Sequence, residues 1–188
     1  MKNRQRSLAK VVTAAVMGLV MVMAFSSLGL AQEAKVLKEA SKMMSDAWKM
    51  FDDGQRMVIK GLEMNNLIAA QLGVQDLMEP GNKTIGLGRD TVLTGAKSFA
   101  QGEKIVMTTD DAKVLKEGVD MLKTGFKIAT DGKEMMEKGM AMNNQVAESK
   151  GALDKFADGN KIMKDGMGTM AEGIKLFMKG EALYLGNK

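Results

Sequence analysis

Residues 118–144, GVDMLKTGFKIATDGKEMMEKGMAMNN, carry a glycine at every seventh position, and this spacing determines how the chain can fold. With the glycines at position a of a heptad, positions d and e hold apolar pairs such as Met121-Leu122 and Met135-Met136. At about 100° per residue in an α-helix, d and e lie on either side of a. The stretch therefore predicts a long helix with a column of glycines down the centre of an apolar stripe.

The chain after residue 31 is a tandem duplication. The segment AKVLKE at Ala34–Glu39 recurs at Ala112–Glu117, and the agreement continues without a gap to the C-terminus at the same offset of 78 positions. Asn65-Asn66, for example, falls on Asn143-Asn144. Self-similarity of this kind indicates two copies of one structural unit. We assign the copies to residues 32–110 and 111–188.

Each unit is predicted to form two helices. The expected helices cover residues 34–70, 82–107, 112–148 and 160–185. Gly73–Gly81, which contains the only proline, and its copy at residues 151–159 are expected to break the helices. Thr108–Asp111 predicts a short turn between the units, with a continuous helix as the alternative. The predicted fold is all-α: two tandem-duplicated antiparallel helical hairpins with glycine-heptad seams, as one four-helix bundle or an elongated pair.

The glycine column has an energetic cost that the packing must offset. A glycine inside a helix costs about 0.5–1 kcal/mol relative to alanine, so the heptad glycines together cost on the order of 10 kcal/mol. Close approach of two helix backbones is the expected compensation, because no Cβ keeps them apart. We expect the columns of one hairpin to face each other. The expected layers are Gly61–Gly88, Gly54–Gly95 and Ala47–Gly102, with copies Gly139–Gly166, Gly132–Gly173 and Gly125–Gly180.

Residues 1–31 have the pattern of a secretory signal peptide. A basic start precedes the apolar run Val11–Phe25, and Gly29-Leu30-Ala31 supplies small residues before a cleavage site. The pattern predicts export to the periplasm or the cell exterior. An uncleaved N-terminal anchor is the alternative.

The charge of the remaining chain argues against nucleic-acid binding. Four of the 27 basic residues and none of the 23 acidic residues lie in residues 1–31, so the rest of the chain has no net charge. The sequence contains neither cysteine nor histidine. It also lacks a glycine-rich phosphate loop, and no carboxylate pair stands out among the acids. We therefore expect no enzymatic activity and no cofactor.

Methionine is the one residue type that suggests a ligand. Sixteen methionines follow the leader, and Met136/Met140 and Met163/Met167 form pairs four residues apart on one helical face. Thioethers bind Cu(I) and Ag(I), so these four residues are candidate metal ligands. The competing interpretation, which their heptad spacing favours, is adaptable core filling beside the glycines.

Polar residues at the hairpin tips form a second candidate group. They are Asn65-Asn66, Asp76 and Asn82-Lys83, with copies Asn143-Asn144, Asp154 and Asn160-Lys161. We expect them to cluster at one end of each hairpin. A ligand or partner site is conceivable there, but capping and turn hydrogen bonds are the favoured explanation.

These patterns indicate an exported, non-enzymatic helical protein with a structural, scaffolding or partner-binding role. The apolar stripe is widened at position b by large residues such as Trp48, Leu62 and Phe126, which makes self-association plausible. Two alternatives remain open. One is a methionine-based Cu(I)/Ag(I) binding protein, and the other is a protein whose amphipathic helices lie on a membrane surface.

Overall fold

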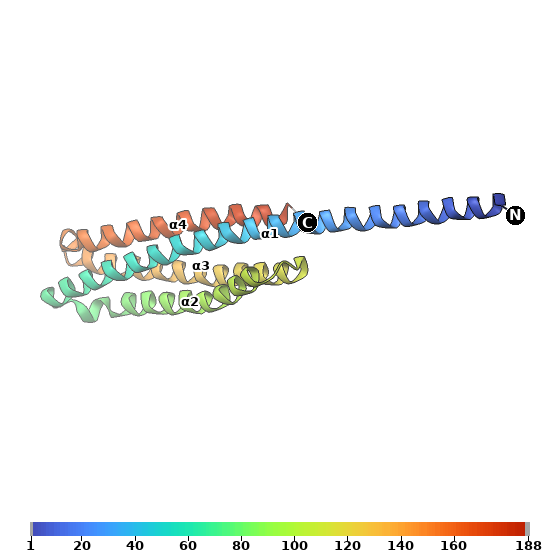
Figure 1. Cartoon of the computed structure of the whole chain (residues 1–188). Helices are drawn as coiled ribbons and strands as arrows, with labels where there is room; N and C mark the ends of the chain where they lie inside the picture. Colours follow the sequence, from blue (N-terminus) through green and yellow to red (C-terminus); the bar gives the residue numbers. More distant parts are fainter. Residues whose placement is uncertain (1, 187–188) are drawn as a thin grey trace.

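The chain forms a single antiparallel four-helix bundle (Figure 1), which confirms the predicted all-α class. The computed structural model describes the backbone of residues 2–186 and, from residue 32 onward, their side chains. No β-strand occurs within residues 2–186. The helices are α1 (Lys2–Leu72), α2 (Gln75–Thr108), α3 (Ala112–Ser149) and α4 (Ala157–Leu185), with a short 3₁₀ helix, η1 (Leu153–Phe156), before α4.

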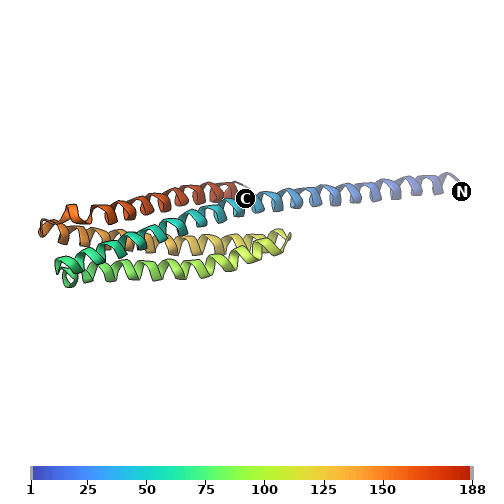
Figure 2. The ribbon, with the colours of Figure 1, turned by 60° about the vertical axis from the view of Figure 1, so that its left-hand side comes forward.

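The N-terminal part of α1 extends alone beyond the bundle. Figures 1 and 2 show it running past the C-terminal end of α4, away from the other three helices. The predicted signal peptide, residues 1–31, falls in this part, whose side chains lie outside the described residues. The cleavage site therefore stays a prediction.

The glycine columns join the two units to each other, so the predicted pairing within each hairpin is wrong. α1 packs mainly on α4, and α2 mainly on α3. A Cβ added at Gly88 would lie 2.5 Å from the carbonyl oxygen of Gly132, and one added at Gly132 would lie 2.5 Å from that of Gly88. A Cβ added at Gly54 would likewise lie 2.5 Å from the carbonyl oxygen of Gly166, and one added at Gly166 would lie 2.5 Å from that of Gly54. The predicted close approach of glycine backbones is thus confirmed, but with partners from the opposite unit.

The register of both seams is constant and follows the duplication. The facing pairs of the α1–α4 seam are Ala40–Gly180, Ala47–Gly173, Gly54–Gly166 and Gly61–Gly159. Those of the α2–α3 seam are Gly118–Gly102, Gly125–Gly95, Gly132–Gly88 and Gly139–Gly81, which are the copies of the first set. The two seams are therefore one interface formed twice.

Bulky side chains at position b explain why the helices of one unit do not form a glycine seam. Trp48 of α1 stacks on Phe99 of α2 with ring centroids 4.6 Å apart. In the second unit the copies of these residues, Phe126 and Phe177, stack at 3.9 Å. Rings inserted between α1 and α2, and between α3 and α4, require a wider spacing than backbone contact. The bundle consequently has two tight sides and two wide sides.

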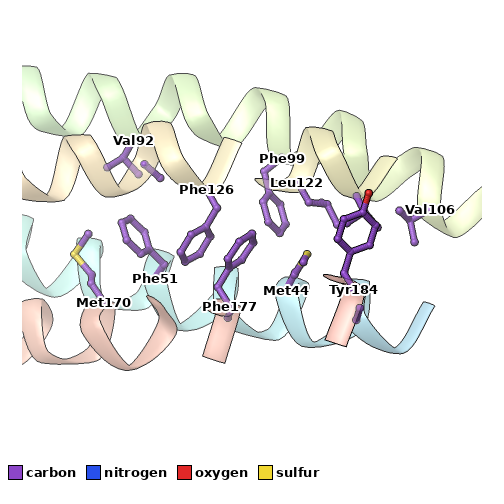
Figure 3. Packing of buried hydrophobic residues seen from close by; sticks show 14 of the residues in the cluster. Met44, Phe51, Val92, Phe99, Val106, Leu122, Phe126, Met170, Phe177 and Tyr184 are labelled. Carbon is purple, nitrogen blue, oxygen red and sulfur yellow. The ribbon is translucent and has the colours of Figure 1, made fainter. Parts of the chain in front are cut away.

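Position e supplies the core of the bundle. In all four helices the described residues at this position are fully or almost fully buried, except Leu72 in the last turn of α1; they include Met44 and Phe51 of α1 and Tyr184 of α4. Figure 3 shows Phe51, Phe126 and Phe177 meeting near the middle of the bundle. Phe51 has no large counterpart, because its copy in the second unit is Ala129. At this pair of equivalent core positions the first unit thus has a phenylalanine and the second an alanine, and the two units are not interchangeable there.

Both interhelical loops within the units are shorter than predicted. α1 ends in a hydrogen-bonded turn at Gly73 (φ 67°), in which the amide of Val74 donates to the carbonyl of Ala69 at 3.0 Å. α2 begins at Gln75 and includes Pro80, so the expected break over Gly73–Gly81 is confined to two residues. Burial of Met78 within the apolar cap at this end of the bundle accounts for the additional helical turn.

The copied loop and the turn between the units are also defined. Gly151 (φ 61°) repeats the role of Gly73, with the amide of Ala152 donating to the carbonyl of Ala147 at 2.9 Å. The turn between α2 and α3 ends at Asp111, whose carboxylate accepts hydrogen bonds from the amides of Lys113 and Val114. The predicted short turn is therefore confirmed, and the continuous helix is excluded.

Glycine substitutions in α2 provide a direct test of the seam. Gly88→Ala places a Cβ against the backbone of α3 and should lower the free energy of unfolding by about 1–3 kcal/mol. Gly86→Ala, two residues away in the same helix, meets nothing within 4 Å and should raise it by about 0.5–1 kcal/mol. Urea denaturation of the two variants measures both values. Equal effects of the two substitutions would contradict backbone contact at the seam.

Candidate functional site

The four candidate methionines lie in one apolar cluster and on two adjacent helices. Met136 and Met140 belong to α3, and Met163 and Met167 belong to α4. Met136 and Met163 are fully buried, Met167 is 7% exposed and Met140 is half-buried at the edge of the same cluster. The side chains of the two methionines at position e lie against glycines of the facing helices. Met136 lies against Gly88 of α2, and Met163 lies against Gly61 of α1. These residues fill the core as predicted.

A layer of asparagines separates the apolar core into two parts. Asn65 and Asn143 occupy position e, at 3% and 4% exposure, between the main cluster and the small apolar cap formed around the loops. The Nδ2 group of Asn65 donates to Oδ1 of Asn160 at 2.8 Å across the α1–α4 seam. Its copy, Asn143, donates to Oδ1 of Asn82 at 2.7 Å across the α2–α3 seam. The layer therefore links the two units at the loop end of the bundle.

The oxygen atoms of these two amides lie against glycine. Neither Oδ1 of Asn65 nor Oδ1 of Asn143 has a hydrogen-bond partner among the described residues. A Cβ added at Gly159 would lie 2.0 Å from Oδ1 of Asn65, and one added at Gly81 would lie 2.0 Å from Oδ1 of Asn143. Each oxygen thus points at a glycine Cα, where a weak Cα–H···O contact is its available interaction. The first glycine of each seam makes room for an amide as well as for a backbone.

The favoured explanation of the hairpin-tip residues by capping is wrong for the asparagines. They lie inside the helices, and all but Asn144 bond to one another, including Asn82 to Asn66 at 2.8 Å. The residues that precede α2 and α4, Val74 and Phe156, form no side-chain cap. Capping looked sufficient because the expected break over Gly73–Gly81 is seven residues longer than the observed loop. The predicted clustering of these residues at one end of the bundle is confirmed.

Removal of an acceptor from the layer should be costly. Asn160→Ala leaves the buried Nδ2 of Asn65 without its partner, and the free energy of unfolding should fall by about 1–3 kcal/mol. Asn144→Ala is the matched control, because the described residues supply no hydrogen bond to its side chain, and it should change stability by about 0.5 kcal/mol or less. Thermal unfolding of both variants decides the point, and an effect of similar size in both would contradict this role of the layer.

The only tyrosine forms a polar contact that the duplication does not repeat. Tyr184 is 1% exposed, and its hydroxyl donates to Oδ1 of Asp120 at 3.1 Å. Lys123 lies 5.4 Å from the ring centroid and pairs with Glu181 at 2.9 Å. Burial, followed by the nearby charge of Asp120, raises the pKa of Tyr184 to about 12. The duplication gives no sign of the contact between Tyr184 and Asp120, because the copy of Tyr184 is Val106.

The raised pKa predicts a loss of stability at high pH. The folded protein holds the phenolic proton more tightly than the unfolded chain, so this contribution is complete below pH 10 and disappears between pH 10 and about 12. The loss amounts to on the order of 3 kcal/mol. Tyrosinate absorbance of the folded chain should appear near pH 12, and that of the denatured chain near pH 10. Tyr184→Phe should remove this part of the pH dependence, whereas a folded-state titration near pH 10 would refute the buried hydrogen bond.

The wide sides of the bundle each carry a groove. The α1–α2 groove has a volume of about 310 Å³ and the α3–α4 groove about 400 Å³. They occupy equivalent positions, because their linings share the copied pairs Ser45/Lys123, Asp46/Thr124, Lys49/Lys127 and Glu103/Glu181. Both combine an apolar floor with lysine and carboxylate side chains at the rim, an arrangement suited to an amphipathic contact.

Neither a metal cluster of the usual oxygen and nitrogen ligands nor a membrane-spanning segment is present in the described residues. No three His, Cys, Asp or Glu side chains come together there. None of the described helices combines the length and the apolar character needed to cross a membrane. Comparison of the chain with protein families, curated proteins and solved structures gave no match.

Proposed function

We propose that the chain is an exported, non-enzymatic helical protein with a structural role, and that it acts by self-association through the outer side of α2. Export rests on the signal-peptide pattern of residues 1–31, in the part of α1 that extends away from the bundle (Figure 2). The observation that supports self-association is a set of exposed apolar and uncharged polar side chains on one helix, on either side of the exposed charged residues Asp90, Lys97 and Lys104. We define this outer face of α2 as Leu87, Leu93, Thr94, Ala100, Gln101 and Met107.

The outer face of α2 exposes large apolar side chains. Leu87 and Leu93 are each 50% exposed, and Met107 is 72% exposed. Exposed apolar side chains gathered on one helix are characteristic of a protein contact, whereas isolated ones are ordinary. A second copy of the same face is a suitable partner, because antiparallel helices related by a two-fold axis bury identical surfaces against each other.

The duplication provides an internal reference for this surface. The copies of Leu87, Thr94 and Gln101 in α4 are Asp165, Glu172 and Lys179. The fold therefore accepts charged residues at these positions. Packing does not require the uncharged residues that α2 has there. The lack of charge at these three positions of α2, in contrast to α4, favours a role specific to α2.

A variant taken from the copied unit tests the proposal. Leu87→Asp and Thr94→Glu together introduce the residues that α4 carries, and they should convert a dimer of the exported chain to a monomer by charge repulsion across the two-fold axis. Leu67→Gln is the control, because it replaces another leucine, 68% exposed on α1, with its copy Gln145 and should leave the dimer intact. Sedimentation velocity measures the species.

Two outcomes would overturn self-association through this face. One is a wild-type chain that is monomeric at all concentrations, and the other is a double variant that associates as the wild type does. Flotation of the monomer with lipid vesicles, lost in the double variant, would assign the face to a membrane surface instead.

A further inference from the structure

The heptad register places four methionines of the second unit at matching levels of α3 and α4, an arrangement that the first unit does not share. Phe126 at position b of α3 stacks on Phe177 at position e of α4, with ring centroids 3.9 Å apart. Met140 and Met163 lie two heptads closer to the connecting loop on the same two helices, at the same b and e positions. Since the helices remain antiparallel in one register, Met140 should face Met163 as Phe126 faces Phe177.

The other two candidate methionines complete this arrangement. Met136 precedes Met140 by four residues, and Met167 follows Met163 by four, so each pair shares one helical face. Met136 and Met167 also lie at the same level along the antiparallel helices α3 and α4. All four side chains contribute to the same apolar cluster. The sequence predicted two separate pairs, and the antiparallel register of α3 and α4 places both pairs at the same level of the bundle.

The first unit shows that packing does not require methionine here. The copies of Met136, Met140 and Met163 are Val58, Leu62 and Ile85. Val58 and Ile85 are fully buried in the same core cluster, and Leu62 packs against it, so branched aliphatic side chains fill the equivalent space. Core filling therefore does not require methionine at these three positions, and the fourth methionine, Met167, stands where the first unit has the exposed Arg89.

We propose that Met136, Met140, Met163 and Met167 form a binding site for a monovalent soft cation, Cu(I) or Ag(I). Thioether sulfur is a soft, neutral ligand that favours these ions over hard divalent cations and needs no proton to be released on binding. Neutral ligands also suit a monovalent ion in an apolar setting, because the bound group carries a single charge. This site goes beyond the structural role proposed above and lies on different helices from the outer face of α2.

Access to the site is from the α3–α4 side of the bundle. Met136 and Met163 are closed off from solvent, and Met167 is nearly so, whereas Met140 is half-buried. An incoming ion would meet Met140 first and pass inward by exchange between neighbouring thioethers. The unbranched methionine side chain has the rotational freedom that such a movement needs.

The experiment is a titration of the full exported chain with silver nitrate, followed by native mass spectrometry and by NMR of the methionine methyl groups. Silver avoids the redox chemistry of copper. We expect one Ag(I) per chain and shifts confined to the methyl groups of the four methionines. The test variant carries Met136→Val, Met140→Leu and Met163→Ile, the residues that the first unit already uses in an intact core. It should fold and lose the bound ion.

A second variant controls for the number of methionines. Met43, Met50 and Met57 form a half-buried row at position d along the outer edge of the α1–α4 seam, spaced one heptad apart. Met43→Leu, Met50→Ile and Met57→Leu together remove as many thioethers and should leave Ag(I) binding unchanged. The proposal is overturned if the wild type binds no ion, if the test variant binds as the wild type does, or if the control variant loses the ion. Circular dichroism confirms that each variant is folded.

Discussion

Contact between helix backbones at the two glycine seams is the constraint on which the rest of the structure depends. Where two glycines face each other, a Cβ added to one would lie within about 2.5 Å of the opposing carbonyl oxygen, as at Gly95 and Gly102 of α2. At the corresponding layers of the other seam α1 has Ala47 and Ala40, and the distances from Gly173 and Gly180 rise to 2.8 and 2.9 Å. A single methyl group per layer therefore moves the helices apart measurably. This sensitivity restricts the register to whole heptads, because any smaller shift would bring the bulky d or e side chains into the seam.

The sequence predicted the helices, the duplication and the close approach, because all three depend on local spacing. It did not predict which helices meet. After a tandem duplication, α2 and α4 present the same glycine column to α1, so the pattern of position a is satisfied by either partner. The choice is made at position b, where Trp48 and Phe126 insert rings between the helices of each unit. Their size was visible in the sequence, but its meaning depends on the arrangement of all four helices.

The candidate sites were also predictable to different degrees, depending on whether they follow from local spacing or from the arrangement of all four helices. The four methionines were identified from their spacing, whereas their placement at the same level of the bundle depends on the register of α3 against α4. The asparagines were identified from the repeat and given the wrong role, because the loop at Gly73 is shorter than its composition suggested. Tyr184 and Asp120 escaped notice, since neither is repeated and they are 64 positions apart in the sequence. Contacts that break the internal symmetry are the ones that a repeat analysis is least able to find.

The asparagine layer shows how the two units recognise each other despite near-identical seams. Glycine columns alone would tolerate a shift of one heptad, because the next glycine would take the place of the last. A shift would move Asn65 away from Asn160 and place its amide against an apolar side chain, at a cost of about 1–3 kcal/mol for each unpaired group. Gly159 leaves room for the Asn65 oxygen and the adjacent Asn160 accepts from its amide, so the glycine and the acceptor together specify a single register. The polar layer is thus the complement of the seams: the glycines set how closely the units approach, and the asparagines set where along the helix they do so.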